Sequence, residues 1–190
     1  QINEEKEELN VLLGKDLRGP MTLTIGFRAR INDGLEGFYR SSFVRDGNME
    51  YVATTQFEES DARRAFPCFD HPSLKAVFNV EMVIDSRYTA ISNAMIAETI
   101  GQDDGRQLVR FKPTPKMSSY LLFFGVGEFD YIEDNWRGKK IRVAAVPGRA
   151  RFGRFAIDCC KKALDYGETY TGIEYPLGKM DLIALTDYAF

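Results

Sequence analysis

The sequence has very few of the residues that build metal and nucleophile sites. It holds one histidine, His71, one tryptophan and three cysteines among 190 residues. An H-E-x-x-H zinc site needs two histidines four positions apart on one helix, so these 190 residues do not contain one. A Ser-His or Cys-His pair would have to use His71 itself. We therefore expect no catalytic residue and no metal site in this chain.

Long runs of one character are lacking as well. The formal net charge is −3, and no long basic run supplies the positive face that nucleic acids require. No stretch approaches the ~20 consecutive apolar residues of a membrane span. No signal peptide opens the sequence. Nucleic acids and membranes are therefore not expected as partners.

The cysteines lack the spacing of a disulfide framework. Cys159 and Cys160 are adjacent on a predicted helix, where their side chains diverge by about 100°. An odd count without such spacing indicates reduced thiols in a cytosolic protein. We expect a cytoplasmic location, and a targeting signal before Gln1 stays an open alternative. Cys68 and His71 as half of a metal site is the weaker interpretation, because Cys68 is more simply a small buried apolar group.

Alternation of apolar and polar residues dominates the first three quarters of the sequence. It is regular over 21–31, which predicts a half-buried strand. Further strand patterns cover 37–43, 49–57, 76–84, 88–92, 107–112, 120–131 and 140–145. Asp46-Gly47-Asn48 is the predicted hairpin turn between the first two of these. Residues 121–126 are nearly all apolar, so we expect them to be buried on both faces. This spacing is typical of an antiparallel sandwich or saddle-shaped sheet, and the fold class is therefore mainly β.

Residues 58–73 interrupt the alternation. They begin with a polar stretch that is compatible with a helical turn, and they continue with apolar bulk and two prolines over 66–72. The prolines exclude regular structure there, so we expect a loop packed against a core. We also expect its charged residues to form ion pairs that fix the loop, because buried charges persist only when they are paired. These residues are Asp61, Arg63, Arg64 and Asp70.

The periodicity changes after position 148. Apolar residues recur at intervals of three and four over 152–170, which predicts an amphipathic helix with Gly172 just past its end. A short strand is predicted over 180–185. Trp136 is most simply an aromatic residue at a hairpin tip.

Five ordered motifs resemble those of the aminopeptidase N family of zinc metallopeptidases. They are T-Q-F-E…A-R…F-P-C-F-D-x-P at 55–72, A-I-S-N at 90–93, K-M-S-S-Y-L-L at 116–122, Y-P-L-G-K-M-D-L-I at 175–183 and D-Y-A at 187–189. The likeness covers nearly the whole chain beyond about Gly19 and is nearest to the tricorn-interacting aminopeptidases of archaea.

The resemblance implies a fragment of a longer enzyme. Residues 1–145 would be the N-terminal β domain, incomplete at its start. Residues 146–190 would be the opening helix and strand of a thermolysin-like α/β catalytic domain. The family's G-A-M-E-N substrate loop and its zinc ligands would follow position 190. Zinc would therefore belong to the parent enzyme, with none bound by this fragment, whose partner would be the missing catalytic domain.

The resemblance also implies a role for Gln56 and Glu58. The parent enzyme would remove N-terminal residues from peptides with a free N-terminus. Gln56 and Glu58 match the family's Q-x-E element, which lines the first substrate subsite and holds the peptide's α-amine. A fixed carboxylate suits this task because it forms a charge-assisted hydrogen bond. Alternation places both residues on one face of a strand end.

Three alternatives stay open. From the residues alone, Gln56 and Glu58 are more simply polar groups that face solvent. The chain as a whole could be a free-standing, non-enzymatic β-sandwich binding module. A pseudo-peptidase with degenerate zinc ligands is a third interpretation.

The single histidine generates the first prediction. The purified 190-residue chain should retain no stoichiometric zinc through dialysis and should show no aminopeptidase activity, because it lacks an H-E-x-x-H pair. Metal analysis by mass spectrometry, with a known zinc enzyme as positive control, measures this. Close to one zinc per chain after dialysis would contradict it.

Overall fold

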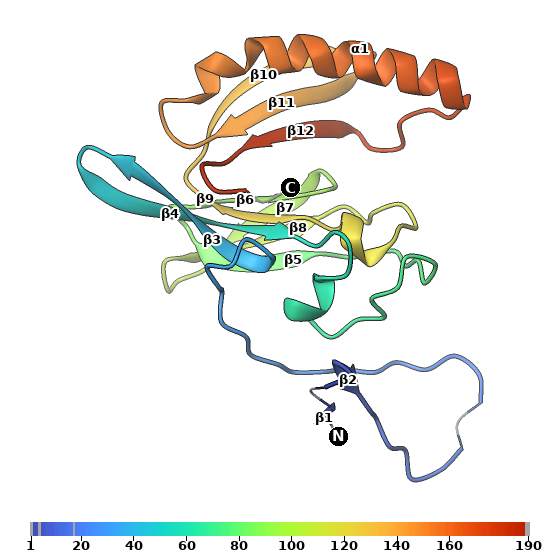
Figure 1. Cartoon of the computed structure of the whole chain (residues 1–190). Coiled ribbons are helices and arrows are strands. Elements are labelled where there is room, and N and C mark those ends of the chain that lie inside the picture. Colours follow the sequence, from blue (N-terminus) through green and yellow to red (C-terminus); the bar gives the residue numbers. More distant parts are fainter. Residues whose placement is uncertain (1, 4, 17, 189–190) are drawn as a thin grey trace.

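The alternating segments pair into two antiparallel sheets. The computed structural model describes residues 2–3, 5–16 and 18–188. One sheet has the strand order β3-β4-β9-β6 and the other β5-β8-β7, and every pair in them is antiparallel (Figure 1). Their strands are β3 (Gly37–Arg45), β4 (Asn48–Gln56), β5 (Glu81–Asp85), β6 (Thr89–Ser92), β7 (Ile96–Gly101), β8 (Arg106–Phe111) and β9 (Phe124–Gly127). The mainly β, antiparallel fold class expected from the sequence is confirmed.

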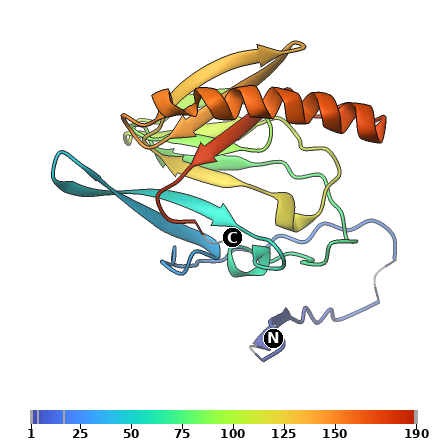
Figure 2. The same ribbon diagram turned by 45° about the horizontal axis from the view of Figure 1, so that its top comes forward.

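A third sheet carries the helix. Its order is β10-β11-β12, with β10 (Asp130–Trp136) antiparallel and β12 (Lys179–Ala184) parallel to β11 (Lys139–Ala145). Helix α1 (Arg154–Thr171) connects β11 to β12 and lies across this sheet, on the side away from the other two sheets (Figures 1 and 2). Position 145, the domain boundary predicted from the sequence, is the last residue of β11. The predicted boundary therefore separates two neighbouring strands of one sheet, β11 and β12.

The predicted hairpin between β3 and β4 is confirmed. Its turn residues Asp46 and Gly47 have φ values of 50° and 80°, and Arg45 pairs with Asn48. Two successive left-handed residues match the right-handed twist of the flanking strands, which explains an Asp-Gly pair at this position.

The predicted strand over 21–31 is wrong. None of these residues is in a strand, and their alternating apolar side chains are exposed: Met21 60%, Leu23 58%, Ile25 37%, Phe27 54% and Ile31 44%. The two short strands before them, β1 (Ile2–Asn3) and β2 (Glu8–Leu9), pair only with each other. A strand is stable only beside a partner that bonds its backbone and covers its apolar face, and the described residues provide none along 21–31.

The segment 120–131 does not form one strand. It contains a 3-10 turn at Ser119–Leu121, strand β9 and the start of β10, so the chain changes sheets between Gly127 and Asp130. Leu122 is 4% exposed but Leu121 is 49% exposed, so burial on both faces is also wrong for this run. The turn at Ser119 explains the difference, because it rotates Leu121 outward before β9 begins. The pattern also did not predict β7 as a strand.

Three apolar clusters hold the layers together. Ala90 of β6 packs with Val109 and Phe111 of β8, which joins the two antiparallel sheets face to face. Phe57, Ala62 and Leu122 form a second cluster beneath the 58–73 loop. The third lies between α1 and its sheet and comprises Trp136, Ile141, Val143, Ile157 and Cys160. Trp136 does stand beside a hairpin turn, but it is only 6% exposed and donates from Nε1 to Asp165 on α1 at 3.0 Å.

Helix α1 has one covered and one open apolar face. Ile157 and Cys160 face the sheet, and Gly172, with φ 69°, ends the helix as expected. The other face carries large exposed side chains: Phe155 79%, Tyr166 69% and Tyr170 78%. Phe152, in the 3-10 turn Ala150–Gly153 just before the helix, is 64% exposed. The rings of Tyr166 and Tyr170 stack with centroids 5.7 Å apart. Within the described part of the chain, no helix is both long and apolar enough to traverse a bilayer.

A buried charge cluster joins the helix-bearing sheet to the four-stranded sheet. Arg142 on β11 binds Asp181 on β12 through two hydrogen bonds of 2.6 and 2.9 Å. Lys179 pairs with the same carboxylate and donates to the carbonyl oxygen of Ser92 on β6 at 2.6 Å. The side chains of Lys179 and Asp181 are 6% and 7% exposed. Burial opposes ionisation of Asp181, but the two cations outweigh it and hold the pKa of its carboxyl below the ordinary value.

This cluster predicts an unequal response to two substitutions. Asp181→Asn leaves two buried cations side by side and should lower the free energy of unfolding by about 3–5 kcal/mol. Lys179→Met leaves Asp181 paired with Arg142 and mainly deprives the Ser92 carbonyl of a donor, so it should cost about 1–3 kcal/mol. Urea unfolding measures both.

Lys140→Met is the matched control. Lys140 on β11 lies opposite Lys179 in the strand register, but its side chain is 45% exposed and forms an ion pair with Glu133. Its effect on the free energy of unfolding should stay below about 1 kcal/mol.

The stabilisation by Asp181 should depend on pH. Because the pKa of Asp181 is lowered in the folded protein, its contribution to the free energy of unfolding is present above the unfolded pKa of 3.8 and is lost as the pH falls through the folded pKa. The difference between wild type and Asp181→Asn should therefore shrink from about pH 6 to about pH 3. Equal costs for the two buried positions would contradict the prediction.

Candidate functional site

Gln56 and Glu58 lie where β4 ends. Gln56 is the last residue of the strand and is half-buried, Phe57 is 2% exposed, and Glu58 is exposed. This alternation turns Gln56 and Glu58 away from the core that Phe57 enters. The Phe57 ring meets the rings of Phe66 and Phe124 edge to face, with centroids 6.0 and 6.1 Å apart. The strand end that carries the two polar residues is thus fixed by packing.

The loop after Glu58 is held by the ion pairs expected from the sequence. Asp70 accepts from the backbone N–H of Arg63 at 3.0 Å and from its Nε at 3.1 Å, and from Ser119 Oγ at 2.6 Å. The Asp70 side chain is only 4% exposed. Arg64 Nε binds Asp61 Oδ1 at 2.7 Å. The network is confirmed, and it fixes the loop that follows the candidate site.

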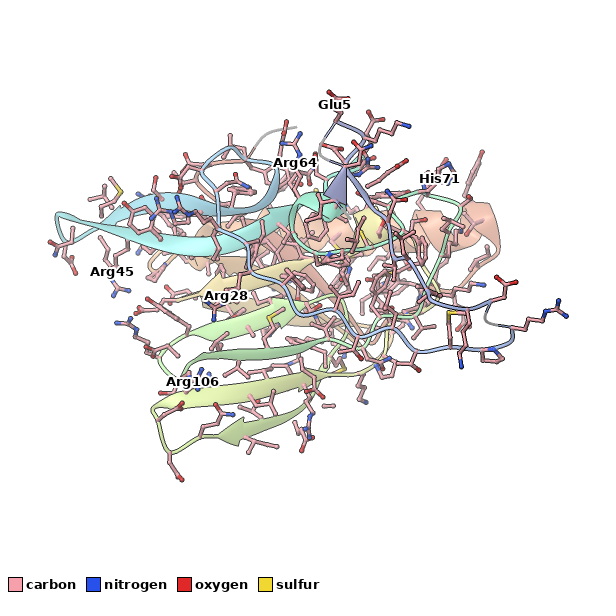
Figure 3. The ribbon with its side chains drawn as sticks, turned by 90° about the horizontal axis from the view of Figure 1, so that it is seen from below. Glu5, Arg28, Arg45, Arg64, His71 and Arg106 are labelled. Carbon is pink, nitrogen blue, oxygen red and sulfur yellow. The ribbon has the colours of Figure 1, made fainter. Side chains whose placement is uncertain are left out.

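Cys68 and His71 have different environments. Cys68 packs against the core cluster beneath the loop, and burial raises the pKa of its thiol to about 11, so it remains an unreactive thiol at neutral pH. His71 is exposed, and its Nδ1 lies 2.8 Å from Ser73 Oγ. Figure 3 shows His71 toward the end of the molecule opposite Arg45, the last residue of β3. Phe69, which lies between Cys68 and His71 in the sequence, is 83% exposed. Only part of the apolar bulk in this loop therefore packs on the core.

The five motifs quoted from the sequence meet one another in space. Asn93 accepts from the N–H of Phe123 at 2.8 Å and donates to the carbonyl of Leu121 at 2.7 Å. Ser118 Oγ donates to the carbonyl of Pro72 at 2.6 Å. Together with Ser119 on Asp70 and Lys179 on Ser92, these bonds connect the first four motifs.

The fifth motif is anchored on β3, at the open edge of its sheet. Asp187 accepts through Oδ2 from the N–H and the hydroxyl of Ser42, at 2.9 and 3.1 Å. Its own N–H donates to Ser41 Oγ at 3.0 Å, and its carbonyl accepts from the Tyr39 hydroxyl at 3.0 Å. Burial, with Tyr188 and Asp187 nearby, raises the pKa of Tyr39 to about 12, so this hydroxyl remains a donor. Residues 189 and 190 lie outside the described residues.

Tyr188 then brings the fifth motif against the first. Its hydroxyl donates to Gln56 Oε1 at 2.9 Å, across 132 positions of sequence. Burial raises the pKa of Tyr188, and the neighbouring charge of Glu58 adds to the shift, so the phenol stays protonated at neutral pH. Tyr188 is not among the site residues predicted from the sequence. Its place in the D-Y-A motif was the available signal, but strand alternation could not place it beside Gln56.

This arrangement offers oxygen acceptors and one negative charge, which suit a cation with several N–H donors. It does not suit a metal. Over residues 2–3, 5–16 and 18–188, no three His, Cys, Asp or Glu side chains gather as a metal would require.

Relatives of known name match almost the whole sequence. The puromycin-sensitive aminopeptidase of Caenorhabditis elegans is 40% identical over 190 residues, which is 96% of this chain and 20% of that protein. Aminopeptidase M1 of Arabidopsis thaliana is 40% identical, over 98% of this chain and 21% of that protein. The probable aminopeptidase 2 of Sulfurisphaera tokodaii is 41% identical, over 88% and 21%. The chain thus spans about a fifth of the length of the curated relatives that it matches.

The family model of the peptidase M1 N-terminal domain matches residues 1–121. The matched range includes β4, which carries Gln56, and the loop after Glu58, and the relatives extend the likeness to 96% and 98% of the chain. The motifs, the fold and these matches agree with the resemblance to the aminopeptidase N family. This chain belongs to the peptidase M1 family, of which it carries the N-terminal domain.

Proposed function

We propose that this chain is part of a zinc aminopeptidase that removes N-terminal residues from peptides, and that it contributes the site for the peptide's free α-amine. The observation that carries the proposal is the contact between Tyr188 and Gln56 beside Glu58. It gathers acceptors and a carboxylate at a strand end that is fixed by packing. The relatives, named as aminopeptidases, support the peptide substrate.

In this proposal Glu58 binds the α-ammonium group and thereby fixes the position of the peptide's N-terminus. A carboxylate at a fixed place selects a peptide whose first residue carries an ammonium group and rejects a blocked terminus. Gln56 adds a neutral acceptor on the same face. Bond cleavage and zinc would reside in other parts of the parent protein.

We also propose that the open face of α1 packs against that remaining part. Four large side chains are each more than 60% exposed: Phe155, Tyr166 and Tyr170 on the helix, and Phe152 in the 3-10 turn just before it. Exposed apolar patches of this kind mark interfaces. We retain the proposal that residues 1–145 form the β domain and that 146–190 open the catalytic domain, whose body would cover this face.

Glu58→Ala in the full-length enzyme tests the proposed subsite. It should lower kcat/KM on free-amine peptides by about thirtyfold to a few thousandfold, the range for truncating one partner of a desolvated charge pair. Glu58→Gln should lose less, because a neutral acceptor remains. Stability should barely change, since Glu58 is exposed.

Glu59→Ala is the matched control, because Glu59 is the adjacent exposed glutamate and has no role in the proposed subsite. It should keep kcat/KM within about twofold of wild type. If Glu58→Ala also stays within twofold, Glu58 is an ordinary surface carboxylate and the subsite assignment is wrong.

A further inference from the structure

The tail after β12 is fastened before it reaches the candidate site. Four hydrogen bonds hold Asp187 on β3: two from Ser42, one to Ser41 and one from Tyr39. Ser41 and Tyr39 are both fully buried, and β3 is the last strand on its side of the sheet. The backbone of Asp187 is therefore fixed, and with it the position from which the next side chain leaves.

That next side chain ends on Gln56. The Tyr188 hydroxyl is 2.9 Å from Gln56 Oε1, and Glu58 lies near enough to act on the same phenol. A glutamine amide has two different ends, and only its oxygen can accept from an ammonium group. Gln56 is half-buried at a strand end, so an unsupported amide would rotate and present its NH₂ group to the cation for part of the time. A hydrogen bond from a fixed donor removes that freedom.

We propose that Tyr188 is a positioning residue of the amine subsite: anchored through Asp187, its hydroxyl keeps the side-chain oxygen of Gln56 turned toward the place beside Glu58 where the ligand's primary ammonium binds. The inference rests on the proposed function and deepens it. The ammonium then meets one neutral oxygen and one carboxylate in fixed positions. Tyr188 acts through Gln56 and does not itself touch the ligand.

The test uses Tyr188→Phe in the full-length enzyme, with two competitive inhibitors that differ only in the α-amino group: a short peptide analogue whose first peptide bond is replaced by a non-hydrolysable link, and its des-amino counterpart. Loss of one orienting hydrogen bond should weaken the amine-bearing inhibitor by about three- to tenfold. The des-amino analogue should change less than twofold, because it has no ammonium to receive. Tyr88→Phe, which removes a hydroxyl one residue before β6, should leave both inhibition constants unchanged. Matching unfolding midpoints for the variants confirm that the fold is intact.

A double-mutant cycle separates positioning from direct contact. The quantity compared is the inhibition constant of the des-amino analogue divided by that of the amine-bearing inhibitor. In a Gln56→Ala background, Tyr188→Phe should have no further effect on this ratio, because the residue through which it acts is gone. An unchanged ratio for Tyr188→Phe alone, equal weakening of both inhibitors, or a full effect in the Gln56→Ala background would each overturn the inference. If Glu58→Ala lowers the ratio while Tyr188→Phe does not, only this inference fails. If Glu58→Ala leaves the ratio unchanged, the proposed function fails.

Discussion

The carboxylate of Asp181, held between Arg142 and Lys179, is the interaction on which the position of the site depends. It belongs to β12, but through Lys179 it reaches the Ser92 carbonyl on β6, in a different sheet. The two sheets are therefore fixed relative to each other where β12 begins. Six residues after Asp181 the chain reaches Asp187, which is bound to β3. The tail that carries Tyr188 is thus fastened at both ends of a short span.

Both anchors are polar, and this has a physical consequence. A buried ion pair stabilises little more than well-packed apolar residues would, because desolvation offsets much of the attraction. It does, however, penalise every arrangement in which one partner is left alone. Apolar contacts between the sheets would tolerate a slide along the strands, whereas Lys179 reaches one particular carbonyl. Asp187 in addition satisfies the Ser42 N–H on an exposed sheet edge, a position that would otherwise invite pairing with another chain.

The sequence predicted those parts of the structure that local chemistry decides. The Asp46-Gly47 turn, the helix ending at Gly172 and the Arg63–Asp70 pair all depend on neighbours within a few residues. The segment 21–31 has the same alternation as β3, yet it forms no strand, because alternation gives a preferred face and says nothing of whether a partner strand is present. The contact of Tyr188 with Gln56 spans 132 positions and could not follow from periodicity. The shared motifs did indicate both ends of that contact, without indicating that they touch.

The stability of the β domain and the geometry of the site depend on the same few residues at the end of β4. Phe57 points into the aromatic cluster with Phe66 and Phe124, so the residues on either side of it must point out. A slip of one residue would bury Gln56 and Glu58 and expose Phe57, at the cost of a buried aromatic ring and a desolvated carboxylate. The packing of Phe57 therefore determines the direction of both polar side chains. Their own contacts with solvent would not fix it. The proposed function requires one ammonium group at a fixed distance from the bond that is cleaved. For that role a strand end held in this way is a better support than a free loop, because a strand held by ladder hydrogen bonds and core packing cannot move without breaking both.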